Sequence, residues 1–299
     1  IMWAFNNCCL AQELKVADTA RPMISVHDQA EEFKPDTLNI EEISPLDISN
    51  DRGLFLIAPD GKMQLRILGS IRFSALYDMV EMPVKKSFNT YYIPTADDKV
   101  RLANYYNSLN ESRLGFEVKR LVGKSIVFGR IEMDFNGNSG QFRIRHAYGQ
   151  VGNLLFGQTW SLFSNVASMP STVDGDGPTG SVVQRNPQIR YRIRYFQSLE
   201  LAAALEYSIP DLNTQDYDSL RLEVIQMIPD FTTRVKYSGD FGNVQFSTVL
   251  NTISLKNQEN KITNLFGFGG SVSGLFELDN DQNIKYQATA GKSVSHYIT

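Results

Sequence analysis

Apolar residues recur at every second position over short stretches of this chain, and polar or charged residues stand between them. The first clear stretch alternates Leu65, Ile67, Gly69, Ile71, Phe73, Ala75 and Tyr77 with Gln64, Arg66, Ser70, Arg72, Ser74 and Asp78. Successive side chains of a β-strand point to opposite sides, so a period of two indicates a strand with one apolar and one polar face.

The same pattern returns along the chain and predicts about eleven strands. They lie near 64–78, 113–119, 130–135, 142–148, 154–160, 188–193 and 200–207, with weaker patterns near 230–237, 243–254, 264–276 and 283–293. In the stretch near 142–148, Phe142, Ile144 and Tyr148 form the apolar set, opposite Arg143 and Arg145.

The expected connections alternate between short and long. The short ones are 121–124, 152–153, 197–198, 238–242 and 279–282, and the long ones are 79–110, 136–140, 161–182, 210–229 and 256–261. Outer-membrane barrels have short periplasmic turns and long extracellular loops, whereas a soluble β-sandwich obeys no such rule. The alternation favours a barrel with a periplasmic N-terminus.

The polar faces are also highly charged. Arginines recur on successive expected strands, at Arg113, Arg130, Arg143, Arg145, Arg190 and Arg192. Neighbouring guanidinium groups are tolerated around water or well-paired carboxylates, and a water-filled lumen provides such a setting. We predict an all-β fold, a transmembrane antiparallel β-barrel over 61–299. Bacterial single-chain barrels have even strand numbers, so about eleven strands predict an incomplete barrel that lacks C-terminal strands.

Composition excludes two other classes of protein. Charged or amide side chains interrupt every apolar stretch before about eighteen residues, which excludes a helical membrane protein. A mean hydropathy of −0.24 is compatible with barrel strands, because half of their residues are polar. The net charge of −4 and the lack of a Lys/Arg block exclude a nucleic-acid partner.

The first residues, 1–11, are similar to the end of a signal peptide. Residues 1–5 are apolar, and a small-residue pattern ends at Ala11 before polar residues follow. Cleavage there removes Cys8 and Cys9, so no disulfide framework is expected. A buried N-terminal segment is the alternative. A lipid-modified cysteine is disfavoured by the two asparagines before Cys8.

Residues 12–60 are predicted to form a periplasmic N-terminal segment. Its central part is acidic, poor in aromatic residues and interrupted by Pro35 and Pro45. Such a composition favours an extended, partly ordered chain.

The most specific stretch is 155–191, which reads LFGQTWSLFSNVASMPSTVDGDGPTGSVVQRNPQIRY. Its GQTW start (157–160), its acidic, glycine-rich middle (174–180) and its RNPQIRY return (185–191) resemble the DcaP-like trimeric outer-membrane porins. The stretch is similar, less closely, to phosphate-selective porins. In strand order the resemblance covers roughly 61–299.

This resemblance implies a homotrimeric porin of about sixteen strands per barrel in the outer membrane of a Gram-negative bacterium. It also implies that 161–182 folds into the lumen as a constriction loop. Expected partners are outer-membrane lipid and small anionic or polar solutes, with no cofactor, no metal and no enzymatic activity. Members often begin with a coiled-coil stalk, but 28–51 is broken by prolines and lacks heptads, and the closing strands with a terminal aromatic residue are absent.

Two acidic residues of the expected constriction loop, Asp174 and Asp176, would face the arginine wall. Opposite charges across a narrow point set up a transverse field that orients dipolar solutes. The alternative is that these charges pair only to hold the loop in place, and the two roles overlap.

The inward charges predict selectivity. Nine basic residues occupy the clearer inward positions: Arg66, Arg72, Arg113, Lys119, Arg130, Arg143, Arg145, Arg190 and Arg192. Six acidic residues share them: Asp78, Glu117, Glu132, Asp134, Glu200 and Glu206. The basic surplus predicts a mild anion preference, and the resembled family suggests small carboxylates.

Other functions remain as alternatives. A glycan-binding or adhesion protein could use tyrosines of the long loop 79–110, which are Tyr91, Tyr92, Tyr105 and Tyr106. A barrel hydrolase would need a catalytic histidine, and neither His146 nor His296 stands in a recognisable motif. An EF-hand calcium loop starting at Asp174 fails because Arg185 occupies its twelfth position, although a looser calcium site stays open.

Overall fold

The computed structural model describes residues 54–80, 103–123, 125–172, 177–196, 198–210, 222–279 and 282–298. The expected signal remnant 1–11 and the rest of the segment up to residue 53 lie outside these residues. Within the described residues, no helix has the length and apolar character needed to cross a membrane.

Strands make up nearly all of the described secondary structure. They are β1 (Leu54–Ile57), β2 (Met63–Ser70), β3 (Ser74–Asp78), β4 (Asn104–Ser108), β5 (Arg113–Val122), β6 (Ser125–Asp134), β7 (Arg143–Val151), β8 (Leu154–Trp160), β9 (Arg185–Tyr195), β10 (Leu199–Glu206), β11 (Glu223–Ile225), β12 (Asp230–Gly239), β13 (Gly242–Lys256), β14 (Ile262–Asp279) and β15 (Gln282–Lys292). Three short 3-10 helices accompany them in the described residues: η3 (Asn138–Gly140), η4 (Val166–Ser168) and η6 (Ser295–Tyr297).

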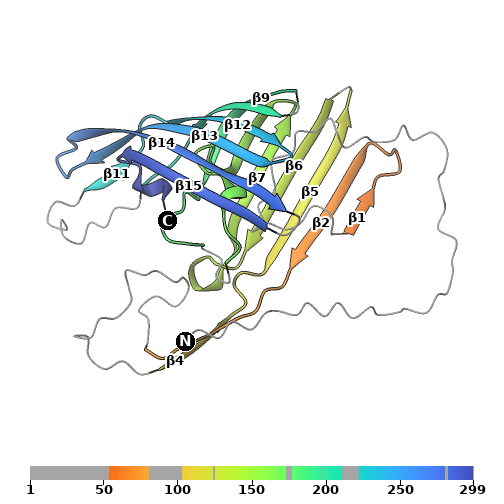
Figure 1. The fold of residues 1–299 in the computed structure, drawn as a ribbon, viewed down its shortest axis with the longest axis horizontal. Helices are drawn as coiled ribbons and strands as arrows, with labels where there is room; N and C mark the ends of the chain where they lie inside the picture. Colours follow the sequence, from red (N-terminus) through yellow and green to blue (C-terminus); the bar gives the residue numbers. More distant parts are fainter. Residues whose placement is uncertain are drawn as a thin grey trace. The chain divides into compact units, whose positions relative to one another are not determined.

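Thirteen strands form one antiparallel sheet, in the order β1-β2-β5-β6-β7-β8-β9-β10-β12-β13-β14-β15, with β11 paired to β13. Apart from β11, the strands of this sheet pair in the order in which they follow one another along the chain, and β3 and β4 form a separate two-stranded sheet. The sheet curls round (Figure 1), and no pair joins β1 to β15 among the described residues. The predicted all-β antiparallel architecture is confirmed.

The first long hairpin differs from the prediction. The expected strand 64–78 is divided into β2 and β3, and the expected loop 79–110 contains β4, which pairs with β3. Residues 71–73 face four residues, 109–112, on the partner side, so the pairing is interrupted. There the Ser112 hydroxyl accepts a hydrogen bond from the Arg72 amide at 3.1 Å. A side chain thus replaces a backbone partner, which residue alternation alone does not reveal.

Two short strands also lie where none was expected. β1 falls within the predicted N-terminal segment 12–60, and β11 within the predicted loop 210–229. β1 pairs with β2, and β11 pairs with β13.

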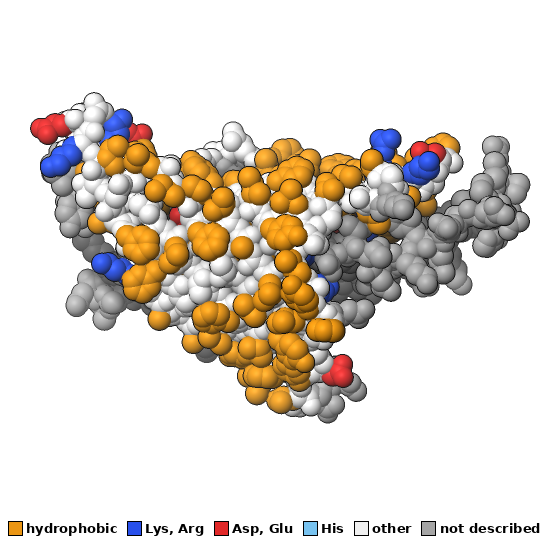
Figure 2. All heavy atoms as spheres, turned by 90° about the horizontal axis from the view of Figure 1, so that it is seen from above, with side chains coloured by type: hydrophobic (Ala, Val, Ile, Leu, Met, Phe, Trp, Pro, Cys, Tyr) orange, Lys and Arg blue, Asp and Glu red, His pale blue; other side chains and the backbone are white. Residues whose placement is uncertain are grey.

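Polar and apolar residues separate onto the two faces of the sheet. On β9, Arg190 is 1% exposed, whereas the adjacent Ile189 is 59% exposed. We call the face that carries Arg190, Glu132 and Glu206 the inner face. Figure 2 shows part of the outer surface, where hydrophobic side chains predominate and most charged side chains lie near the margins. An apolar outer face around a polar inner face is typical of a transmembrane barrel.

Tyr148 lies on the inner face, 6% exposed, so its predicted outward position is wrong. The β6–β7 pairing shifts between Glu132 and Met133, because Glu132 pairs with His146 and Met133 with Ile144. Arg145 is therefore an extra residue of β7. A β-bulge of this kind reverses the alternation beyond it, and the inward set becomes His146, Tyr148 and Gln150.

The outer face provides a stability test at Ile189, which lies mid-strand between Phe156 and Leu205 on the adjacent strands. We expect Ile189→Arg to destabilise the folded protein in a bilayer by about 2–4 kcal/mol, because a charge at mid-depth must leave water. Ile189→Leu is the matched control and should change little. Denaturant unfolding in lipid vesicles measures both, and equal stabilities would contradict a lipid-facing position.

Candidate functional site

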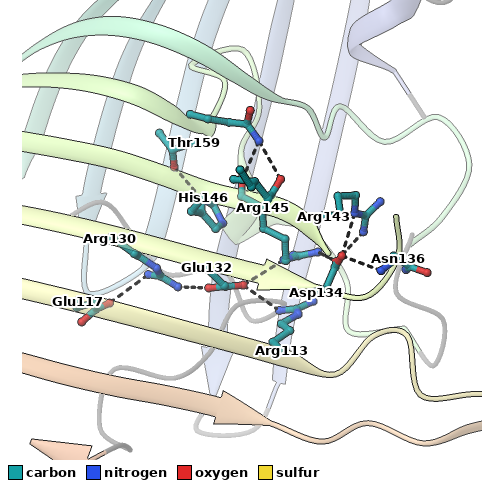
Figure 3. Close-up of polar contacts among 12 residues, drawn as sticks. Arg113, Glu117, Arg130, Glu132, Asp134, Asn136, Arg143, Arg145, His146 and Thr159 are labelled. Carbon is teal, nitrogen blue, oxygen red and sulfur yellow. Dashed lines mark hydrogen bonds and ion pairs between the residues drawn. The ribbon is translucent and has the colours of Figure 1, made fainter. Parts of the chain in front are cut away.

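The centre of the inner-face charges is Glu132, which is fully buried on β6 (Figure 3). Its carboxylate pairs with Arg130 of the same strand, with Arg145 of β7 at 3.1 Å, and with Arg113 of β5 at 3.9 Å. Three guanidinium groups from three strands thus meet one carboxylate.

The ion pairs continue on both sides of Glu132. Glu117 lies 3.5 Å from Arg130 and 3.2 Å from Arg66 of β2. Asp134 accepts two hydrogen bonds from Arg143, at 3.0 and 2.7 Å, and one from Arg145 at 3.1 Å. We call these residues the β5–β7 cluster: Arg66, Arg113, Glu117, Arg130, Glu132, Asp134, Arg143 and Arg145.

Strand register explains why these charges meet. Arg113 stands opposite Asp134, and Glu117 opposite Arg130, across β5 and β6. Asp134 also stands opposite Arg143 across β6 and β7. Cross-strand neighbours on one face lie within contact distance, so opposite charges at these positions form pairs. The alternation of residues predicts which side chains share the inner face. Which of these side chains form ion pairs depends on the strand register, which the structure provides.

A second group of charges surrounds Glu200 on β10. Its carboxylate lies 3.6 Å from Arg192 and 3.1 Å from Arg194 of β9, and it also pairs with Arg234 of β12. We call these four residues the Glu200 cluster. Sequence reasoning missed Arg194 and Arg234, although both continue the period-two pattern of their strands.

Arg190 has a different environment from the other predicted wall arginines. Its Nε donates to Gln188 Oε1 at 3.0 Å, and its Nη2 donates to the carbonyl oxygen of Trp160. Trp160 ends β8, and the loop 161–184 follows it. The Arg190 side chain therefore supports the point where this loop leaves the sheet.

The described parts of the loop 161–184 lie against the inner face of later strands. On β13, Ser247 Oγ donates to the Phe163 carbonyl at 3.1 Å, and on β15, Lys285 Nζ donates to the Met169 carbonyl at 2.8 Å. At the other end of the loop, the Val182 amide donates to Gln287 Oε1 at 3.3 Å. The loop thus crosses from β8 to β13 and β15. Asp174 and Asp176 lie outside the described residues.

His146 is a buried residue of the β7 wall. Its Nδ1 lies 3.0 Å from Thr159 Oγ1, and its ring contacts the edge of Trp160 at a centroid distance of 5.7 Å. Across the described part of the chain, no group of three or more His, Cys, Asp or Glu residues is arranged to hold a metal ion.

The structure thus divides the predicted site residues among three places. Arg113, Arg130, Arg143, Arg145, Glu132 and Asp134 belong to the β5–β7 cluster, Arg192 belongs to the Glu200 cluster, and Arg190 lies at the start of the loop.

Comparison with known families identifies the chain. The family model described as DcaP outer membrane protein matches residues 42–294. The chain belongs to the DcaP outer membrane protein family. The recognised resemblance is confirmed, and the bacterial outer membrane is the location of this DcaP-family protein.

Solved structures agree with the fold of this DcaP-family chain. The outer membrane channel DcaP of Acinetobacter baumannii matches with a TM-score of 0.65 and 22% identity, over 78% of this chain. The match covers 65% of that channel's chain. No curated protein matches.

Two further structures are more distant. A loop-deletion mutant of OmpT from Vibrio cholerae has a TM-score of 0.40 and 12% identity, with coverage of 77% of this chain and 82% of that one. The anion-selective porin from Comamonas acidovorans has a TM-score of 0.37 and 12% identity, with coverage of 76% and 78%.

The β5–β7 cluster provides a second stability test. We expect Glu132→Gln to lower the free energy of unfolding by about 3 kcal/mol, because it leaves buried guanidinium groups short of a counter-charge. The control is Glu223→Gln, which removes an exposed ion pair with Lys256 (3.8 Å) and should cost under about 1 kcal/mol. Denaturant titration of both variants decides, and equal losses would show that Glu132 has no special role.

Proposed function

We propose that this protein is a porin through which small hydrophilic solutes diffuse passively, with a preference for anions. The observation that carries the proposal is the surplus of guanidinium groups on the inner face. The β5–β7 cluster has five arginines and three carboxylates, and the Glu200 cluster has three arginines and one carboxylate.

The surplus matters because the carboxylates fix the arginines in place but balance only part of their positive charge. Carboxylates hold the guanidinium planes in place, and the excess positive charge sets the potential along the wall. A pore lined with such charge favours anions, and the planar donor pairs of arginine match carboxylate oxygens. Small carboxylates are therefore the proposed solutes.

The loop 161–184 is the proposed constriction. Its described ends lie on the inner face, where they occupy space that a lumen would otherwise leave to water. We propose that Asp174 and Asp176 face the β5–β7 cluster, as the sequence suggests, so that solutes pass between opposite charges. This arrangement would orient dipolar solutes as they cross.

Liposome swelling tests the preference for anions. When an ionophore carries the counter-ion, vesicles with the protein should swell faster in the salt of a small carboxylate than in an uncharged solute of similar size. Arg192→Gln with Arg234→Gln should reduce that ratio by roughly fivefold or less per charge, since a unit charge at 4 Å in water contributes about 1 kcal/mol. Lys261→Gln, which removes one positive charge from an exposed loop, is the control for the effect per charge.

If the variant with Arg192→Gln and Arg234→Gln keeps the wild-type ratio, the Glu200 cluster does not set selectivity. If the wild-type protein causes no swelling, the porin proposal itself fails. An adhesion function would then be favoured, because Tyr105 on β4 is 59% exposed and could stack on a sugar ring.

We also propose that the protein assembles as a homotrimer in the outer membrane. The exposed apolar side chains of the outer face suit contact with either lipid or a neighbouring barrel. Electrophoresis of the unheated, detergent-extracted protein should give a band at about three times the mass of the heat-denatured monomer. A band at the monomer mass under these conditions, and after cross-linking, would contradict the trimer.

A further inference from the structure

Glu206, the last residue of β10, is a buried carboxylate outside both arginine clusters. It is 0% exposed, and the groups that contact its carboxylate come from four different segments. The Leu162 amide of the loop 161–184 donates to Oε1 at 3.0 Å, and Thr232 Oγ1 of β12 donates to the same oxygen at 2.6 Å. Asn186 Nδ2 of β9 donates to Oε2 at 3.0 Å, and Tyr297 Oη of η6 lies 3.5 Å from it.

Asp230 stands opposite Glu206 in the β10–β12 pairing and is 1% exposed. Two facing carboxylates repel each other unless donors lie between them. The Tyr297 hydroxyl meets that need, since it donates to Asp230 Oδ2 at 2.8 Å. Burial and the two nearby carboxylates raise the pKa of Tyr297 far above its usual value, so the hydroxyl keeps its proton and stays a donor.

The same residues are joined by apolar contacts. Phe163, Val182, Val249, Val294 and Tyr297 form one buried cluster on the inner face. The rings of Phe163 and Tyr297 meet edge to face at a centroid distance of 5.5 Å. Val182 also forms a β-bridge with Ile298. Both ends of the loop are thus packed against the segment 293–298.

Gly269 of β14 makes room for this packing. A Cβ at this position would lie 3.3 Å from the Phe163 ring and 3.1 Å from Val294. The absence of a side chain on β14 lets the loop and the segment 293–298 approach the sheet closely. The loop therefore packs closely against the inner face at Gly269, and Glu206 holds its first residues through the Leu162 amide.

We propose that Glu206 is a positioning residue for the constriction: through Leu162 it fixes where the loop leaves the wall, and through Tyr297 it couples the loop to the segment 293–298. This inference rests on the proposed porin function. Its consequence is a constriction of constant width. Loss of the anchor should let the loop move in and out of the solute path.

Single-channel recording in planar bilayers tests the anchor with Glu206→Gln. The glutamine keeps the size of the side chain, but its amide nitrogen must face either Asn186 Nδ2 or the Leu162 amide, and both of these are donors. Losing a hydrogen bond to a charged acceptor shifts a two-state equilibrium about tenfold. We expect a similar rise in the time spent at sub-conductance levels.

Tyr297→Phe provides an independent variant, because it removes the hydroxyl and keeps the ring that packs on Phe163. It should also increase the time spent at sub-conductance levels. If Glu206→Gln does not fold, the Tyr297→Phe recordings test the positioning role by themselves. A heat-modifiable band on gels identifies folded protein in each case. A purely structural role would reduce the folded fraction but leave the folded channels steady.

Glu200→Gln is the matched comparison, since Glu200 lies on the same strand and face and pairs with arginines instead. It should move the reversal potential toward that of a more anion-selective pore without adding sub-conductance levels. If the wild-type protein conducts steadily and the Glu206→Gln and Tyr297→Phe variants conduct equally steadily, the positioning role is overturned and the porin function is not. A wild-type protein that passes no current would overturn the porin function and this role with it.

Discussion

Guanidinium and carboxylate groups pair along one face of the sheet, and this pairing allows several arginines to share that face. Without carboxylates such as Glu132 and Glu200, arginines from adjacent strands would repel one another at contact distance. With them, the strands can curl with their charges inward and their apolar residues outward. The same ion pairs hold each guanidinium group in a fixed orientation, so the excess positive charge stays at fixed positions on the inner face.

The inner face also holds the loop 161–184, by a different kind of contact. Near β5–β7 the wall offers charge pairs, whereas near β13–β15 it offers a small-residue surface, amide and hydroxyl donors, and an apolar cluster around Phe163 and Tyr297. Under the proposed function, the charge pairs near β5–β7 attract solutes, and the surface near β13–β15 supports the loop. Glu206 helps to support the loop, because its partners include a backbone amide of the loop and hydroxyl groups instead of arginines.

Much of this could be predicted from the sequence, because a period of two follows directly from strand geometry. Alternation placed Arg130, Glu132 and Arg190 on the inner face correctly. It failed at Tyr148, where one extra residue in β7 reverses the faces. The facing of Glu206 and Asp230 was not foreseen, because register across the connection between β10 and β12 cannot be read from either strand alone.

The reversal potential of the wild-type protein in a salt gradient reports the sign of the charge that permeating ions meet, and therefore tests whether the inner-face arginines govern permeation. With potassium chloride more concentrated on one side of a planar bilayer, we predict a potential of the sign set by chloride permeation. A potential of the opposite sign, set by potassium, would show that the arginines only pair structurally and do not govern permeation.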